Sequence, residues 1–262
     1  MKKNFLIIND LTKIYDVGTS NEIVALKNFS LSIKKGEFIT IVGSNAAGKT
    51  TLFSLINGSE LPTSGSILLE RKNLLALPEF RRAKLISCVR QNPNDSVITS
   101  MTLAENLALA KINGRNANLN KGVKKEWKKE FKIILESFHL GLEKRLDDKV
   151  SSLSGGQKQI IALIMATISK PKLLLLDEHT AALDPNVSKT VLRITDQIVK
   201  AGEITTLMIT HNIRQAIEHG NLLILLEKGR IGFKVSGIKK QSLNIIEIEN
   251  RLENRLAKPK NY

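Results

Sequence analysis

Short apolar runs and amphipathic segments alternate along most of this chain, and their periods predict its elements. Residues 5–11 and 29–33 are alternating or β-branched runs separated by polar turns, a pattern that predicts an antiparallel β layer. The run at 38–42 is apolar and β-branched throughout, which indicates a buried strand ending before Gly43. Leu52, Leu55 and Ile56 then recur at helical spacing up to Gly58. This part of the chain is therefore predicted to run strand, glycine loop, helix.

The rest of the chain continues the alternation of strands with helices. We expect a returning strand at 66–69, a largely helical stretch at 78–146 with interruptions near 92–96 and 113–120, strands at 172–176, 206–210 and 222–226, and helices at 187–200 and 213–219. Strands that alternate with helices favour a mostly parallel sheet covered on both faces. The fold class predicted here is α/β.

Composition and charge limit the possible partners. The chain has 262 residues, 42% of them hydrophobic, which suggests one large domain or two small ones. Its net charge of +15 raises nucleic acid or an anionic membrane surface as partners. The lysines between Lys121 and Lys132 are interrupted by Glu126 and Glu130 at helical spacing, which favours a solvated, partly self-paired face. The C-terminal tail is also basic, and because no aromatic residue stands among its Arg251, Arg255, Lys258 and Lys260, a nucleic-acid partner is unsupported.

Two further exclusions concern membranes and cysteine chemistry. The first ten residues lack a secretory apolar region, and the longest apolar stretch, 160–168, is far below the roughly 20 residues that cross a bilayer. Cys88 is the only cysteine, which excludes an internal disulfide framework.

The segment from Gly43 to Thr50 fits G-x-x-x-x-G-K-[ST] and stands between a predicted strand and a predicted helix. Backbone N–H groups of such a loop wrap the α- and β-phosphates of a nucleotide, aided by the helix dipole. Lys49 is expected to reach the β- and γ-phosphates, and the Thr50 hydroxyl to ligate Mg²⁺. The candidate ATP-binding residues here are Gly43, Ser44, Asn45, Ala46, Ala47, Gly48, Lys49, Thr50 and Thr51.

A second candidate element is the apolar run 173–176, which ends in two carboxylates. Asp177 would stand at the C-terminal end of a buried strand, where ligands sit in open α/β sheets, and is the candidate for the Mg²⁺ shell. Glu178 is the candidate catalytic base that orients or deprotonates the attacking water.

With these two elements flanking Leu-Ser-Gly-Gly-Gln at 153–157, the chain resembles the ATP-binding subunits of ABC transporters from about Phe5 to about Gly237. The resemblance implies a P-loop NTPase (RecA-like) core with the N-terminal antiparallel β layer and an α-helical subdomain. In the family this pentapeptide caps the γ-phosphate of a nucleotide held by the opposite subunit, so two chains form a head-to-tail ATP sandwich. Ser154, Gly155, Gly156 and Gln157 would open a helix and offer free amides and a hydroxyl to that phosphate.

The resemblance extends to four single positions. Gln91 resembles the glutamine that touches Mg²⁺ and the attacking water, and His211 resembles the switch histidine that contacts the γ-phosphate and supports Glu178. Asp184 falls in the loop that crosses the dimer interface. Tyr15 resembles the aromatic residue that stacks on adenine, although its surroundings equally fit a place in the β layer.

Three departures from the family pattern stand out. Ala46 replaces a glycine in the phosphate loop, so we expect a backbone conformation there that a Cβ tolerates. His179 replaces the proline after the catalytic glutamate, and Ile160 and Met165 stand where the family often has arginines. We expect these departures to bear on fine regulation more than on catalysis.

The expected function is an ATPase subunit that powers transport of a small solute, with permease subunits, a second copy of itself and, indirectly, an extracytoplasmic solute-binding protein as partners. The stretch 177–185 resembles a bacterial importer subgroup with branched-chain-amino-acid-type permeases, which favours import of an amino acid or related solute. The expected place is the cytoplasmic face of the membrane.

Two other functions are compatible with parts of the sequence. The first alternative is a soluble ABC ATPase acting on nucleic acid, ribosomes or cofactor assembly; the second, a non-hydrolysing ATP-binding scaffold, is disfavoured because Lys49, Asp177, Glu178 and His211 are all present. Residues 1–237 are predicted to form the ATPase domain, with a helical subdomain at about 92–165, followed by a basic, helical tail at 238–262 for which a surface helix, a regulatory role and a membrane-surface role stay open.

Overall fold

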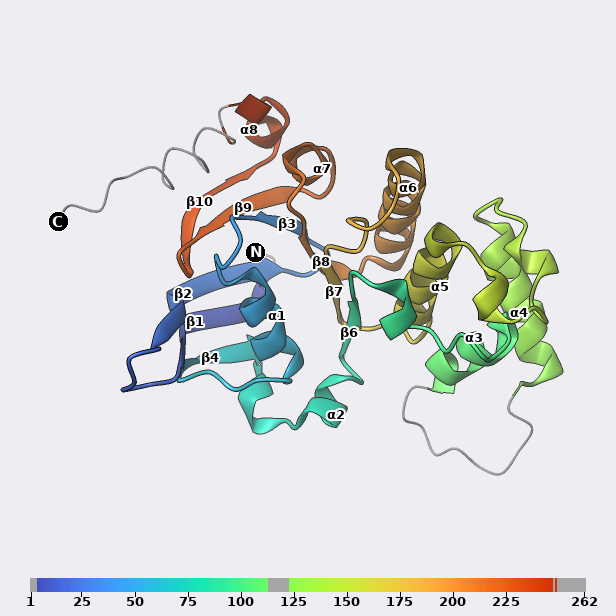
Figure 1. The fold of residues 1–262 in the computed structure, drawn as a ribbon, viewed down its shortest axis with the longest axis horizontal. Coiled ribbons are helices and arrows are strands. Elements are labelled where there is room, and N and C mark those ends of the chain that lie inside the picture. The colour runs from blue at the N-terminus through green and yellow to red at the C-terminus, as the bar shows by residue number, and fades with distance from the viewer. Residues whose placement is uncertain (1–3, 113–122, 247, 249–262) are drawn as a thin grey trace. The chain divides into compact units, whose positions relative to one another are not determined.

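The computed structural model describes residues 4–112, 123–246 and 248 (Figure 1). The chain forms two units, each described here by itself. Unit 1 combines Met1–Ala83 with Glu203–Tyr262, and unit 2 is Lys84–Gly202. Within the described ranges, every helix is too short or too polar to cross a lipid bilayer.

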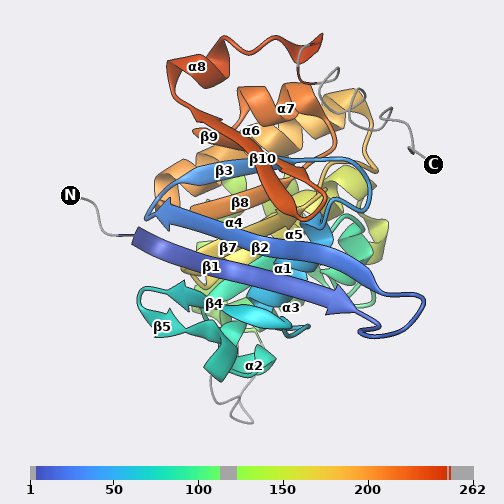
Figure 2. The same cartoon turned by 90° about the vertical axis from the view of Figure 1, so that its left-hand side faces the viewer.

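The first sheet of unit 1 is the N-terminal antiparallel β layer. Its strands are β1 (Asn4–Tyr15), β2 (Ile23–Lys34), β4 (Ser64–Leu69) and β5 (Lys72–Asn73), in the order β2-β1-β4-β5. Figure 2 shows β1 and β2 as long neighbouring strands, with β4 on the other side of β1. Ile8 pairs with Leu31 on one side and with Ile67 on the other, and all three are buried. The prediction of an antiparallel layer is confirmed.

The other strands of unit 1 centre on β3 (Phe38–Val42), whose five residues are all buried. It runs parallel to β8 (Thr205–Ile209) and to β9 (Leu222–Glu227). The outer strand β10 (Arg230–Ser236) pairs antiparallel with β9 and was not predicted from the sequence. Its residues alternate between exposed and half-buried, so it lacks the continuous apolar run that identified its neighbours.

The helices of unit 1 are α1 (Lys49–Asn57), α2 (Glu79–Arg82), α7 (Ile213–Glu218) and α8 (Ile238–Gln241). Helix α1 ends at Gly58, which adopts the left-handed conformation of a helix cap, as its sequence predicts. Helix α7 packs Ala216 onto buried side chains of β3 and β9, with Leu243 covering the same cluster. Helix α8 begins the predicted helical tail; residues 247 and 249–262 of that tail lie outside the described residues.

The described part of unit 2 combines two parallel strands with four longer helices. Strand β6 (Ile86–Val89) pairs in parallel with β7 (Leu173–Asp177), and the helices are α3 (Leu103–Ile112), α4 (Lys125–Glu136), α5 (Gly155–Ile168) and α6 (Pro185–Gly202). The largely helical stretch expected at 78–146 is wrong at β6, because four residues are too few to reveal a period. The interruption expected at 113–120 lies outside the described residues.

The lysine-rich face of α4 forms ion pairs with other segments of unit 2, and among the described residues none of these pairs joins two residues of α4. Lys128 forms an ion pair with Asp147, and Glu130 forms one with Lys111. Lys121, the first lysine of the cluster, lies outside the described residues. The prediction of a solvated face is confirmed, but its partners are wrong, because Asp147 and Lys111 both lie outside α4.

Candidate nucleotide-binding site

The phosphate loop of unit 1 joins β3 to α1 and needs its two outer glycines for close packing. A Cβ on Gly43 would lie 2.4 Å from the carbonyl oxygen of Leu226, and one on Gly48 would lie 2.4 Å from the carbonyl oxygen of Ala25. Gly48 also adopts φ +98°, a region that side-chain-bearing residues rarely enter. Both positions therefore require glycine for steric reasons that are independent of any ligand.

Ala46 adopts a left-handed backbone with φ +60°. A Cβ is tolerated in this region, as expected, but at a cost to an L-residue of about 1–2 kcal/mol. The neighbouring backbone is held in place by a hydrogen bond from the N–H of Gly229 to the carbonyl of Ala47, 3.0 Å long. The loop thus keeps the shape of a glycine-containing phosphate loop while carrying a methyl group, and the amide of Ala46 remains on an exposed part of the loop.

Lys49, the first residue of α1, folds back into the loop. Its Nζ donates to the carbonyl oxygens of Gly43 at 2.7 Å and Ser44 at 2.9 Å, and only 7% of the residue is exposed. No acidic side chain occupies the first turn of α1, and Thr50 is exposed there. A buried ammonium beside the N-terminus of a helix makes the loop a positively charged receptor for phosphate oxygens.

Tyr15 is the last residue of β1, so its place in the β layer is confirmed, and it also contacts the phosphate-loop helix; its stacking on adenine stays a prediction. Its hydroxyl donates to Glu60 Oε2 at 2.7 Å and lies 3.4 Å from the Oγ1 of Thr51. Burial, followed by the hydrogen bond to Glu60, raises the pKa of Tyr15 above its usual value. The phenol therefore stays neutral and its ring is fixed beside α1.

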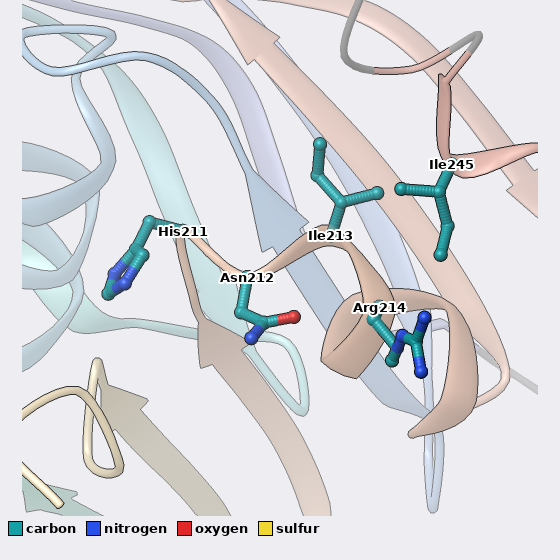
Figure 3. Close-up of a pocket in the computed structure, with 5 residues that line it drawn as sticks. All are labelled: His211, Asn212, Ile213, Arg214 and Ile245. Carbon is teal, nitrogen blue, oxygen red and sulfur yellow. The ribbon is translucent and has the colours of Figure 1, made fainter. Parts of the chain in front are cut away.

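His211 lies two residues beyond the end of β8, in the turn that leads into α7. Thr210 donates through Oγ1 to Gln215 Oε1 at 3.1 Å, and Asn212 caps α7 by accepting from the N–H of Gln215 at 3.1 Å. Figure 3 shows the imidazole pointing away from Arg214, at one end of an open pocket of about 410 Å³. These hydrogen bonds fix the turn that carries the histidine.

The two candidate carboxylates of unit 2 stand where β7 ends. Asp177 is its last residue, and Glu178 follows with a left-handed backbone at φ +47°. A hydrogen bond of 2.9 Å from the N–H of Ala181 to the carbonyl of Glu178 closes this turn. Burial, and then the negative charge of Asp177, raise the pKa of Cys88 on β6 to about 11. The thiol is therefore protonated at neutral pH.

Gln91 is exposed and follows a residue that the helix α5 holds in place. The Nε2 of Gln159 donates to the carbonyl of Arg90 at 3.2 Å. Gln159 is fully buried, and its Oε1 has no hydrogen-bond partner among the described atoms. Sequence reasoning missed Gln159, although a glutamine between the pentapeptide and the apolar run of α5 is a signal that could have identified it.

The pentapeptide begins α5 with a capping box. Ser154 Oγ accepts from the N–H of Gln157 at 3.3 Å, and Gln157 Oε1 accepts from the N–H of Ser154 at 3.1 Å. The two glycines differ sharply: a Cβ on Gly156 would lie 2.1 Å from Val187 Cγ1, whereas one on Gly155 would meet only Leu183 at 3.9 Å. Gly156 is therefore required for the close packing of α5 against α6, whereas Gly155 has room for a side chain.

Asp184 and His179 have structural partners within unit 2. Asp184 Oδ1 accepts from the N–H groups of Asn186 and Val187, both at 3.1 Å, and so caps α6. His179 is buried, with its Nε2 3.2 Å from Thr195 Oγ1. The histidine that departs from the family pattern thus ties the turn after Glu178 to α6.

The sequence-predicted residues fall into both units. Unit 1 carries the phosphate loop, Thr51, Tyr15 and His211; unit 2 carries Gln91, the pentapeptide, Asp177, Glu178 and Asp184. Within unit 1 the structure brings Tyr15 against Thr51 and places Lys49 inside the loop.

Comparisons with known proteins identify the family. Residues 26–181 match the ABC transporter family model. The chain is 41% identical over 248 residues to the tyrosine transport ATP-binding protein of Clostridioides difficile, covering 95% of this chain and 98% of the relative. It is 33% identical to the methionine import ATP-binding protein MetN of Haemophilus influenzae over 86% of this chain, but spans only 63% of that relative.

Solved structures agree with these sequence matches. The fold is similar to that of the ATP-binding cassette MJ0796 in a dimeric, post-hydrolysis state bound to ADP and Pi, with a TM-score of 0.74, 28% identity and coverage of 88% of this chain and 98% of the other. It is also similar to cbiO1 of Clostridium perfringens, part of the ABC transporter complex cbiONQ, with a TM-score of 0.78, 27% identity and coverage of 97% and 98%. The expected P-loop NTPase core is confirmed, and the chain belongs to the ATP-binding, ATP-hydrolysing subunits of the ABC transporter family.

Proposed function

We propose that this chain hydrolyses MgATP to drive the import of an amino acid, with tyrosine as the first substrate to test. The observation that carries the ATPase part is the buried Lys49 ammonium inside a glycine-shaped phosphate loop. The import part rests on the relatives, since the 41% identical protein is named for tyrosine transport and another for methionine import. The finer placement among importers with branched-chain-amino-acid-type permeases stays a prediction within the same class of solute.

The phosphate loop supplies the binding energy in this proposal. The loop amides from Gly43 to Gly48 receive the α- and β-phosphates, and Lys49 exchanges its carbonyl partners for phosphate oxygens. Thr51 and the ring of Tyr15 lie at the adjoining end of α1, where the ribose and base would extend.

Oxygen donors of this chain suit magnesium. The Thr50 hydroxyl, the Asp177 carboxylate and the Gln91 amide oxygen are hard donors, and Mg²⁺ typically takes one or two protein oxygens together with phosphates and water. When bound, the ion would neutralise charge on the phosphates.

Three side chains then act on the attacking water. Glu178 accepts its proton, His211 supports that carboxylate and contacts the γ-phosphate, and Gln91 orients the water. Residues 154–157 of the pentapeptide and Asp184 act across a head-to-tail homodimer on the partner subunit's nucleotide. We propose that closure and reopening of this dimer, on permease subunits at the cytoplasmic face of the membrane, drive transport. Residues 1–237 would form the ATPase domain, with about 92–165 as its helical subdomain and 238–262 as its tail.

The test combines catalysis with transport. Glu178→Gln should bind ATP with an unchanged Kd yet lose turnover, because only the proton acceptor is removed. In the native cell, deletion of this chain should abolish uptake of labelled tyrosine, and only the wild-type copy should restore it. Wild-type turnover by the Gln variant would refute the catalytic assignment, and normal tyrosine uptake in the deletion strain would refute the substrate.

A further inference from the structure

Four side chains of unit 1, Lys13, Tyr15, Thr51 and Glu60, form a contact group at the end of β1, which we name the tyrosine latch. Glu60 Oε2 accepts the Tyr15 hydroxyl at 2.7 Å and lies 3.3 Å from Lys13 Nζ. Thr51 Oγ1 is 3.4 Å from the same hydroxyl. The latch joins three segments: the end of β1, the helix α1 and the loop that follows α1.

Lys13 is held over the ring of Tyr15. Its Nζ lies 4.7 Å from the ring centroid and also donates to the carbonyl of Leu61 at 3.0 Å. Only 17% of its side-chain surface is exposed, so it does not sample solvent as a surface lysine would. The ammonium therefore occupies one face of the ring by a cation–π contact, and a stacking partner can use only the opposite face.

Glu60 fixes the other degree of freedom, the tilt of the ring. A charged acceptor makes a short, strong hydrogen bond to the phenol, and that acceptor is itself held by Lys13. The two charges therefore have different tasks. Without Lys13, the Glu60 carboxylate would be an uncompensated negative charge beside the proposed nucleotide pocket. Without Glu60, the ring of Tyr15 could rotate.

We propose that Lys13 and Glu60 are positioning residues that hold Tyr15 as a one-sided stacking platform for the nucleotide base. This proposal rests on the proposed function, in which Tyr15 meets adenine. Base-to-aromatic stacking is tolerant of base identity, so the latch should strengthen binding of any nucleotide over that of a triphosphate without a base. Pre-ordering of the ring contributes by removing rotamer entropy before the base arrives.

The experiment separates base binding from phosphate binding. Dissociation constants of the full chain are measured with Mg²⁺ for ATP and for inorganic tripolyphosphate. Tyr15→Ala should weaken ATP binding by about ten-fold, a typical loss for one stacked base. Glu60→Ala and Lys13→Ala should each weaken ATP binding by roughly two- to ten-fold, and by no more than Tyr15→Ala does. Tripolyphosphate binding should be unchanged in all three variants.

Matched variants control for charge and folding. Lys35→Ala and Glu136→Ala remove the same charges from exposed positions and should change neither dissociation constant. Tyr15→Phe and Glu60→Gln, which change the hydroxyl contact with little change in volume, test the latch if an alanine variant fails to fold. Equal weakening of ATP and tripolyphosphate by the latch variants would overturn the proposal, as would an unchanged ATP affinity in Tyr15→Ala. Failure of the proposed function is distinct, because the wild-type chain would then bind neither ligand.

Discussion

Replacing Gly156 by alanine places a methyl group where Val187 already stands. The new Cβ would lie 2.1 Å from Val187 Cγ1, whereas two carbons need about 3.5 Å, so one of them must move by more than 1 Å. Val187 is β-branched and has few alternative rotamers in α6, so α5 and α6 must separate. Overpacking of this kind costs about 1–3 kcal/mol, and up to about 1 kcal/mol returns from the better helix propensity of alanine. The expected net loss of stability is about 1 kcal/mol, or a fall in Tm of roughly 2–4 °C.

Gly155→Ala is the matched control, because its Cβ would meet only Leu183 at an ordinary 3.9 Å. It should leave Tm unchanged or raise it slightly. The double variant Gly156→Ala with Val187→Ala removes the clashing methyl groups and should recover most of the lost Tm relative to Val187→Ala alone. These melts are followed by circular dichroism at the same protein concentration and without nucleotide.

ATP hydrolysis then tells packing from catalysis at the same position. If Gly156 is needed for close approach to a partner subunit's nucleotide, the double variant should regain stability but not turnover, while its ATP affinity stays normal. Recovery of turnover together with stability would show that the glycine acts through packing alone. A Gly156→Ala variant as stable as Gly155→Ala would refute the steric reasoning itself.

Three further predictions concern single residues. Ala46→Gly removes the cost of a left-handed alanine and should raise the free energy of unfolding by up to about 1 kcal/mol, measured by urea titration with ATP affinity as a check that the loop still binds. Cys88 has a folded pKa of about 11 against an ordinary 9.0, so it should resist alkylation at pH 8 in the native protein and react in urea. Its contribution to the free energy of unfolding should be complete below about pH 9 and should be lost as the pH rises toward 11, because the folded state binds the proton more tightly than the unfolded state does. Gln159→Met removes the donor to the Arg90 carbonyl at similar volume and should lower kcat about ten-fold or less with KM little changed; an unchanged kcat would show that this bond does not position Gln91.

The parts of the fold that the sequence predicts are those whose causes are local. Strand β3, the loop and α1 follow from a β-branched run, a glycine pattern and an apolar period that all lie within about twenty residues. Strand β10 follows from pairing with β9 and carries exposed residues along its length, so its own pattern is weak. The same holds for β6, which is defined by its parallel partner β7 almost ninety residues later.

The residues of the candidate site likewise divide into those with partners nearby in the sequence, which can be predicted, and those with distant partners, which cannot. Lys49 is predictable because its partners belong to its own loop, five and six residues away. Gln159 meets a carbonyl 69 residues earlier, and Glu60 meets Tyr15 across 45 residues, so neither partner can be read from spacing. Ala46 carries no compositional sign of its left-handed backbone, because alanine has no preference for it.

A left-handed backbone is not by itself a mark of function in this chain. Lys228 and Glu178 both have one, and they differ in whether another residue could take their place without a functional loss. Lys228 has φ +46° in the hairpin between β9 and β10, a place where any turn former would serve. Glu178 has the same conformation at φ +47°, yet glycine or asparagine there would relieve the backbone at the loss of the carboxylate that follows β7. The surrounding structure holds the glutamate in place through the Ala181 hydrogen bond and the buried His179 next to it. The strained backbone at Glu178 is retained although glutamate is poorly suited to it, and contacts on its C-terminal side hold it in place. This combination points to the carboxylate as the reason why a glutamate occupies the position.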